Sequence, residues 1–237
     1  MNRWLTEMFR KIANLMCKKI KGSEFVVDPD LPITYLLRYC FDRFYMLISG
    51  LYRFRSLVFC GANVRVKSKR MLFLGRGITL GESVYLDCLS TEGVHIGDGV
   101  SIGPYSRVEC TGTIRNVGSG FKIGEGSGIG AFSFIGAAGG VRIGCNVIMG
   151  QRISFHSENH IFDSLDTLIK DQGVIRKSIN IHDDCWVGAN VTFLAGSRVG
   201  SGSIVAAGAV VNGVYPEHSI IAGVPAKVIA SRLRASI

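Results

Sequence analysis

The sequence predicts an all-β fold in which short parallel strands wind into a three-sided prism of stacked coils. Two aliphatic or aromatic residues, two positions apart, recur with a six-residue period, and a glycine often follows the second. A polar or charged residue commonly stands between the two. Clear examples are Val94 and Ile96, Phe121 and Ile123, Val141 and Ile143, and Ile179 and Ile181.

This period has a direct geometric meaning. Residues two apart lie on one face of a strand, so both members of a pair point inward and the residue between them points outward. The following glycine allows the unusual backbone angles of a corner. Three such hexads make a coil of about 18 residues, and residues 60–214 hold about eight coils. An ordinary β-sandwich predicts variable turn lengths and no fixed period.

The chain divides into three segments. Residues 1–59 predict a basic, amphipathic helical extension, residues 60–224 the prism, and residues 225–237 a short C-terminal helix. One inserted loop, at about residues 155–178, interrupts the repeat. A loop of this length in a compact domain is usually functional or disordered, so we expect the chemistry there.

The helical extension has two interpretations. Residues 4–20 place their apolar side chains at helical spacing, and residues 31–59 are more apolar but carry too many charges for a membrane span. The segment is either a helical cap on the open end of the prism or an amphipathic anchor on the inner face of the cytoplasmic membrane. The apolar residues of the first stretch are Leu5, Met8, Phe9, Ile12, Leu15, Met16 and Ile20.

The net charge of +9 is concentrated at one end of the chain. Residues 1–70 hold 14 Lys and Arg against 5 Asp and Glu, whereas residues 71–237 hold 13 of each. No nucleic-acid recognition motif accompanies the basic residues, so an anionic membrane surface is the expected partner rather than nucleic acid.

The seven cysteines form no CxxC pair. An odd number without paired spacing indicates free structural thiols in a reducing compartment. The N-terminus shows no clean apolar run followed by a cleavage site, so the sequence predicts a cytoplasmic protein.

The inserted loop holds the candidate catalytic groups. A neutral imidazole can remove a proton from a hydroxyl near neutral pH, and a neighbouring carboxylate can hold its tautomer. Glu158 and Asp163 are the candidate carboxylates, and His156 and His160 the candidate bases. The polar residues of the loop are His156, Glu158, Asn159, His160, Asp163 and Asp166.

Four ordered motifs give the chain a family resemblance. They are FHSENH at 155–160, DDCWVGANVTFLAG at 183–196, VAAGAVV at 205–211 and AGVPAKVI at 222–229. With the hexads, they resemble the left-handed β-helix, hexapeptide-repeat acyltransferases, and most closely the O-acetyltransferases that modify bacterial surface polysaccharide. The resemblance covers roughly residues 60–237.

The resemblance implies a homotrimer with active sites between neighbouring prisms. It implies acetyl-CoA as donor and the hydroxyl of a sugar or lipid-linked glycan as acceptor, with no metal. It places the general base on His160, which would deprotonate the hydroxyl for direct attack on the thioester. His156 would polarise the acceptor, orient His160 or shape the pocket.

The resemblance also implies a donor site along the coils after the loop. Some relatives carry an asparagine near the thioester oxygen, one coil before the histidine, but residues 132–136 hold none. The oxyanion donor would then be a backbone amide or Asn159. The residues implied to line the donor site are Trp186, Gly188, Ala189, Ala207, Gly208 and Lys227. The alternative interpretation of Gly188 and Gly208 is an ordinary glycine at a coil corner, and both uses can coexist.

Two other functions stay open. A zinc hydratase like the γ-type carbonic anhydrases would use His156 and His160 with a third histidine, for which only His95 and His182 are candidates. A non-catalytic β-helix scaffold subunit would bind no acetyl-CoA and would be indifferent to replacement of His160.

Overall fold

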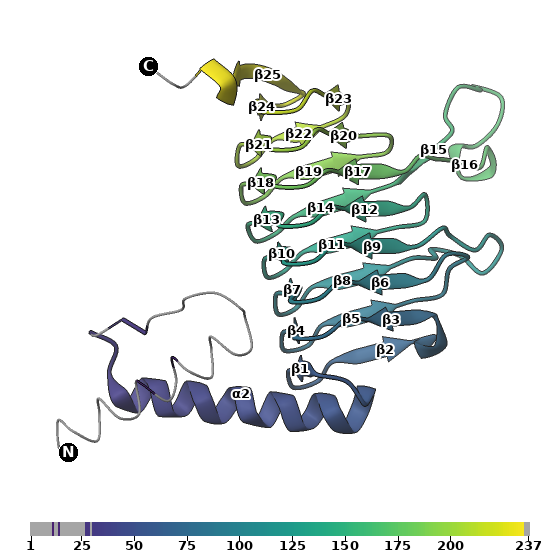
Figure 1. Cartoon of the computed structure of the whole chain (residues 1–237). Coiled ribbons are helices and arrows are strands. Elements are labelled where there is room, and N and C mark those ends of the chain that lie inside the picture. The colour runs from purple at the N-terminus through teal and green to yellow at the C-terminus, as the bar shows by residue number, and fades with distance from the viewer. Residues whose placement is uncertain (1–10, 12–13, 15–26, 29, 235–237) are drawn as a thin grey trace.

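The protein is a left-handed parallel β-helix with a helix across its N-terminal end (Figure 1). The structure is a computed structural model and describes residues 11, 14, 27–28 and 30–234. Three parallel sheets form the sides of the prism, and successive strands of each sheet come from successive coils. Seven complete coils and part of an eighth lie within this part of the chain, which confirms the predicted prism.

Sheet A has nine strands, and sheets B and C have seven each. The strands of sheet A are β1 (Val58–Cys60), β4 (Ile78–Leu80), β7 (Ser101–Ile102), β10 (Gly128–Ile129), β13 (Ile148–Met149), β18 (Trp186–Val187), β21 (Ile204–Val205), β24 (Ser219–Gly223) and β25 (Ala226–Ser231). The strands of sheet B are β2 (Arg65–Lys67), β5 (Tyr85–Asp87), β8 (Arg107–Glu109), β11 (Phe134–Gly136), β14 (Ser154–His156), β19 (Thr192–Leu194) and β22 (Val210–Val211).

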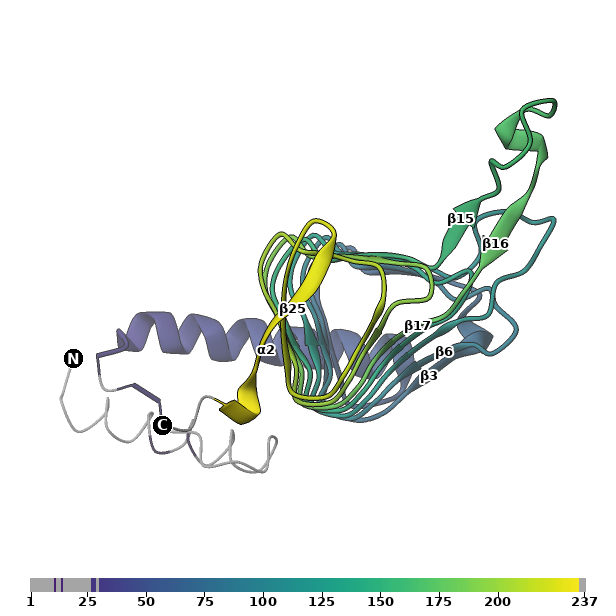
Figure 2. The ribbon, with the colours of Figure 1, turned by 90° about the horizontal axis from the view of Figure 1, so that it is seen from above.

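The strands of sheet C are β3 (Leu72–Leu74), β6 (Val94–Ile96), β9 (Phe121–Ile123), β12 (Val141–Ile143), β17 (Ile179–Ile181), β20 (Arg198–Val199) and β23 (Val214–Tyr215). The chain runs from sheet A to B to C and back to A, so the prism has an A–B, a B–C and a C–A corner. Figure 2, which looks along the stack, shows the three sides superposed.

The hexad pattern places its apolar pairs in the core as predicted. In β6, β9 and β17 the two outer residues are buried and the middle one is more exposed. The buried side chains form one core through the stack, in which Phe155 and Phe193 lie with ring centroids 4.7 Å apart on neighbouring coils. Stacking lets each coil bury the inner face that a single coil would expose to water.

The glycines after the pairs serve a different purpose from the one predicted. A Cβ on Gly124 would lie 2.6 Å from the carbonyl carbon of Gly144, and one on Gly188 would lie 2.5 Å from the backbone nitrogen of Ala207. These glycines are therefore required by backbone contact between coils. The positive φ angles fall two residues later, as at Gly126, whose φ is 70°.

The C-terminal segment differs from the predicted helix over 225–237. Residues Ala226–Ser231 form β25, which pairs antiparallel with β24 and covers the outer end of sheet A. Only a single 3-10 turn, Arg232–Arg234, follows within the described residues. Antiparallel pairing supplies the strand edge that another coil would otherwise occupy.

Helix α2 (Ile33–Phe54) is the described part of the N-terminal extension. It packs against β1, and its Arg53 donates to the carbonyl oxygen of Val64 at 2.6 Å, so this stretch caps the first coil as one interpretation expects. The helix predicted over residues 4–20 lies almost wholly outside the described residues. Among the helices that the structure describes, none is long and apolar enough to cross a membrane.

Cys60, Cys88, Cys110, Cys145 and Cys185 are free thiols, in agreement with the prediction. Cys88 and Cys110 lie in the core on neighbouring coils. Burial away from water disfavours the thiolate and raises the pKa of each thiol to about 12. Cys40, on α2, is exposed.

We predict that Cys88 and Cys110 resist alkylation by iodoacetamide in the folded protein at pH 8, because the reactive thiolate is scarce and covered. Cys145, which is partly exposed, should be alkylated faster than either of them under the same conditions. Mass spectrometry of the digested protein measures all three, and a urea-unfolded sample serves as the control. Equal labelling of Cys145 and Cys110 in the folded protein would contradict the described burial.

Candidate active site

The predicted catalytic loop is an antiparallel arm that leaves the prism at the B–C corner. Strand β15 (Glu158–His160) pairs with β16 (Val174–Arg176), and a 3-10 turn, Ile169–Asp171, lies at its far end. Figure 2 shows the arm projecting from that corner. The sequence predicted an interruption here but not its strands, because an exposed hairpin has no buried face to impose an apolar alternation.

The two candidate bases, His156 and His160, have different surroundings. His156 ends β14, where it pairs with Gly136 and Leu194 on sheet B, and its ring lies 5.7 Å from that of Phe134. His160 lies on the arm opposite Val174, and both imidazoles are exposed. The FHSENH motif therefore spans two structural units, strand β14 of the coil and strand β15 of the arm.

Ser157 marks the point where the chain leaves the coil. Its hydroxyl donates to the carbonyl oxygen of Gly136 at 2.7 Å and accepts from the backbone amide of Gly139 at 2.9 Å. The side chain is buried, so these bonds form away from water. They hold the base of the arm against the preceding coil and so determine where the arm begins.

Glu158 is held by an arginine rather than by a histidine. Within the described residues, its carboxylate pairs with Arg176, whose Nε donates to Oε2 at 2.6 Å. This pairing differs from the expectation that Glu158 orients an imidazole. Asp163 lies beyond β15 on the exposed outer part of the arm.

Arg176 also ties the arm to a second projection. Its Nη1 donates to the carbonyl oxygen of Val117 at 3.1 Å, and Nη2 to that of Asn116 at 3.0 Å. The Arg176 side chain is only 17% exposed, although its two contacts with carbonyl oxygens lie at the surface. A planar guanidinium can hold a carboxylate and two carbonyls at once, which makes Arg176 a fixed joint between the two segments.

The second projection, residues 111–118, was missed by the sequence analysis. It leaves the same B–C corner between β8 and β9, so the repeat is interrupted twice rather than once. Thr111 closes it by accepting from the amide of Gly118 at 3.0 Å. The signal was present as a stretch of ten residues between Cys110 and Phe121 without an inward aliphatic pair.

The faces of the arm separate its polar residues. Alternate residues of a strand point to opposite faces, so Glu158 and His160 share one face and Asn159 lies on the other. The shared face is the one that Arg176 joins to residues 111–118. The side chains of Asn159 and His160 therefore lie on opposite faces of the arm.

Four of the predicted donor residues gather at the A–B corner. Gly188 and Ala189 follow β18, and Ala207 and Gly208 follow β21 at the equivalent place on the next coil. Trp186 begins β18 on the outer surface of sheet A, 56% exposed, between Ile148 and Ile204 of the neighbouring strands. Lys227, on β25, is exposed at the far end of the same sheet.

Gly208 is informative because its neighbours in the stack are not glycines. Its φ is 74°, and the equivalent corner positions hold Asn190 at 59°, Arg152 at 58° and Phe132 at 59°. Since side chains are accommodated at those corners, the backbone conformation alone does not demand glycine at 208. Nothing lies within 4 Å of a Cβ built on Gly208. The space over this corner is open.

The candidate base and the candidate donor residues thus occupy different corners of one chain. His160 is on the arm at the B–C corner, and Ala207 and Gly208 are at the A–B corner. The full width of sheet B separates them within a subunit. The two candidates for a third zinc ligand lie on other sides of the prism from His156 and His160. His95 stacks on Phe73 on sheet C with ring centroids 4.4 Å apart, and His182 is exposed at the C–A corner. Within the described part of the chain, no three His, Cys, Asp or Glu side chains group as metal ligands do.

Comparison with known proteins shows that the repeat matches a known family model and that the chain resembles acetyltransferases. Residues 178–213 match the family model for the bacterial transferase hexapeptide (six repeats). The chain is 32% identical over 179 residues to a probable acetyltransferase of Mycobacterium tuberculosis, with 75% of this chain and 56% of that protein covered. It is 35% identical over 96 residues to the putative lipopolysaccharide biosynthesis O-acetyl transferase WbbJ of Escherichia coli, with 38% and 49% covered.

The chain spans about half the length of the curated relatives it matches. Among solved structures, a mutant of AntD, an N-acyltransferase from Bacillus cereus in complex with dTDP-4-amino-4,6-dideoxyglucose and Coenzyme A, matches with a TM-score of 0.50. The two chains are 19% identical, and 68% of this chain and 84% of that chain are covered. This likeness supports the β-helix fold.

We predict that Arg176→Ala loosens the arm, because it removes one charged pair and two hydrogen bonds at its base. Each charge-assisted bond contributes about 1.5–3 kcal/mol. Amide hydrogen exchange over residues 158–176 should become faster, whereas exchange in the coils should stay unchanged. Lys170→Ala, at the exposed end of the arm, is the matched control. Unaltered exchange in the Arg176 variant would show that other contacts hold the arm.

Proposed function

The chain is a hexapeptide-repeat protein of the left-handed β-helix fold, and we propose that it is an acyl-CoA-dependent O-acetyltransferase. The proposed donor is acetyl-CoA and the proposed acceptor a sugar hydroxyl in the biosynthesis of surface polysaccharide. The observation that carries the proposal is the projecting arm with His160, set on a prism whose A–B corner presents small residues and open space. The named activities of the relatives supply the reaction class.

The donor would lie along the A–B corner. A pantetheine arm is a narrow, extended chain with two amides, and it needs a backbone surface that side chains do not block. Ala207 and Gly208 are exposed at this corner and offer that surface. Gly188 and Ala189 are partly exposed on the preceding coil, where Gly188 also makes the close backbone contact with Ala207. Trp186 would cover one side of it, and Lys227 would meet the phosphates at the nucleotide end.

The active site would be completed by a neighbouring subunit. A homotrimer brings the B–C corner of one prism beside the A–B corner of the next, so the arm of one chain can reach the donor surface of its neighbour. The separation of His160 and Gly208 on different corners of one chain supports this arrangement. A site within a single chain would need them on the same corner.

In the proposed reaction, His160 accepts the proton of the acceptor hydroxyl as the oxygen attacks the thioester carbonyl. The tetrahedral oxyanion then collapses, the C–S bond breaks, and the proton leaves with the coenzyme A thiolate. Holding donor and acceptor together supplies much of the rate without a covalent enzyme intermediate. Because Asn159 points away from His160, a backbone amide is the proposed oxyanion donor.

The acceptor would meet the outer surface of sheet B beside the arm. In register along this surface lie Asp87, Glu109, Gly136 and His156. Carboxylates and an imidazole suit the hydroxyls of a sugar, and the aromatic ring of Phe134 suits its apolar face. His156 is proposed to contact the acceptor from this surface.

We further propose that the basic extension, residues 1–59, keeps the protein at the inner face of the cytoplasmic membrane. A lipid-linked glycan acceptor is presented there. The supporting observation is the net charge of +9 within residues 1–70, which is attracted to anionic lipid.

We predict that His160→Ala lowers acetyl transfer by about 10²–10⁴-fold or more, because the variant lacks the general base. The affinity for acetyl-CoA should stay within a few-fold. Labelled acetyl-CoA incubated with nucleotide sugars, lipid-linked sugars and polysaccharide fragments identifies the acceptor and gives the rate. Unchanged turnover in this variant would remove His160 from the mechanism, and a larger loss in His156→Ala would assign the base to His156.

We predict that Ala207→Leu weakens acetyl-CoA binding by about tenfold or more, because the larger side chain fills the proposed pantetheine surface. Isothermal titration calorimetry measures the affinity. Ala131→Leu is the matched control, since Ala131 occupies the same corner three coils earlier, away from the proposed donor surface. Equal affinities in both variants would place the donor elsewhere.

A further inference from the structure

Helix α2 turns two of its arginines, Arg43 and Arg53, toward the prism. The guanidinium of Arg43 lies 3.7 Å from the ring centroid of Phe59 and donates to the hydroxyl of Thr79 at 3.2 Å. Gly50 sits against β1 so closely that a Cβ would clash with the backbone of Val58. The helix is therefore fixed to the first coil through polar and small residues.

The opposite side of α2 is an exposed aromatic stripe. Each member has another member three or four residues away, and all of them lie along one face of the helix. Phe41 is 70% exposed and Tyr52 is 89% exposed. We call this face the aromatic stripe; it consists of Leu37, Phe41, Phe44, Tyr45, Ile48 and Tyr52. A soluble helix normally packs such a face against its own core, and here the core contact is made by the other side.

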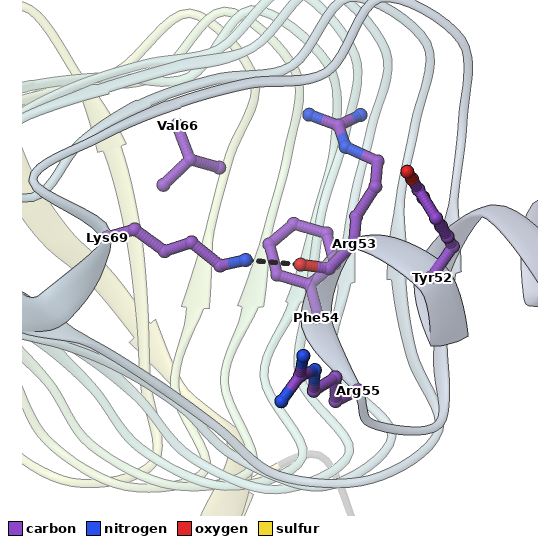
Figure 3. A pocket seen from close by; sticks show the side chains of 6 residues that line it. All are labelled: Tyr52, Arg53, Phe54, Arg55, Val66 and Lys69. Atoms are coloured by element: carbon purple, nitrogen blue, oxygen red, sulfur yellow. Dashed lines mark hydrogen bonds between the residues drawn. The ribbon is translucent and has the colours of Figure 1, made fainter.

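A basic pocket lies at the C-terminal end of the stripe. Figure 3 shows it between the end of α2 and the first coil. It has a volume of about 460 Å³, and three of its six lining residues are cationic while none is acidic. Those six residues are Tyr52, Arg53, Phe54, Arg55, Val66 and Lys69. Tyr52 belongs to both the stripe and the pocket.

The cations of the pocket are held in different ways. Lys69 donates to the carbonyl oxygen of Arg53 in the last turn of the helix, and the Arg53 guanidinium donates to the carbonyl oxygen of Val64. Arg55 follows the helix with a φ of 54°, so its exposed side chain departs from the helical direction. Among the described residues, no salt bridge involves these three cations. An anion would stabilise them, and guanidinium and ammonium groups both bind phosphate oxygens.

We infer that the aromatic stripe and the basic pocket together form a docking surface for an anionic phospholipid bilayer. The stripe would enter the interface between headgroups and acyl chains, where tyrosine and phenylalanine are favoured. The pocket would receive a headgroup phosphate. Figure 1 shows α2 running across the axis of the coils, so one long face of the helix can lie along a flat membrane.

The charge distribution favours a bilayer over a second protein copy. The cations of the pocket adjoin the stripe, and a second copy would bring the same cations against them. An anionic membrane neutralises them instead. This inference rests on the proposed membrane contact of residues 1–59, narrows it to one surface, and is independent of the acyl-transfer proposal.

The test is sedimentation of the full chain with vesicles of phosphatidylcholine, with and without phosphatidylglycerol. A stripe variant, Phe41→Ser with Ile48→Ser and Tyr52→Ser, and a pocket variant, Arg55→Glu, should each weaken binding to the anionic vesicles by about tenfold or more. The matched controls are Val214→Ser, an exposed apolar residue at the other end of the prism, and Lys170→Glu on the arm. Both controls should bind as the unaltered protein does.

Other outcomes overturn the inference in distinguishable ways. If the stripe and pocket variants bind anionic vesicles as the unaltered protein does, and deletion of residues 1–21 abolishes binding, the membrane contact stands but this surface is rejected. No binding by the unaltered protein would reject both. A smaller assembly of the stripe variant by light scattering, with vesicle binding retained, would make the stripe an interface between copies. Competition by soluble glycerophosphoglycerol alone, without lipid dependence, would reduce the pocket to a phosphate site.

Discussion

Backbone contact between successive coils at the corners is the constraint on which the rest of the structure depends. The Cβ positions of Gly124 and Gly188 are occupied by the backbone of the next coil, so no larger residue fits without displacement. This contact keeps the coils in register over the whole stack, and register determines where each outward residue lies. Stacking of the coils, rather than nearness in sequence, brings Ala207 against Gly188 and onto the same edge as Trp186.

The same register separates chemical groups that the proposed reaction needs together. Small residues face open space at the A–B corner, and the arm with His160 leaves at the B–C corner, held by Arg176. A rigid prism cannot fold one corner onto another, so the proposed site requires a second subunit. The N-terminal end supplies a third specialised surface, where Arg43 and Arg53 of α2 contact the prism and the exposed aromatic stripe is the proposed membrane contact.

The sequence predicted what the repeat controls and missed what it does not. The inward pairs follow from the six-residue period, and burial confirms them. The loop predicted from about residue 155 starts at Ser157, because Phe155 is a buried residue of β14. The strands of the arm and most of residues 111–118 are exposed, so no alternation of apolar and polar residues in the sequence predicted them. Residues 226–231 form a strand because β24 offers an open edge. The inward orientation of Arg43 could not be predicted, since a sequence shows an apolar face without showing which side meets the core.

Intersubunit complementation is the measurement that most directly tests whether the proposed site joins two corners from two chains. His160→Ala and Ala207→Leu subunits would be unfolded together, refolded as mixed trimers and assayed for acetyl transfer. The acetyl-CoA concentration would be kept far below the Kd of the Ala207→Leu variant, so that each variant alone has little activity. If each site takes His160 from one subunit and the donor surface from its neighbour, an equal mixture should recover about a quarter of the unaltered activity. If both belong to one subunit, every site keeps a defect, and the mixture stays inactive.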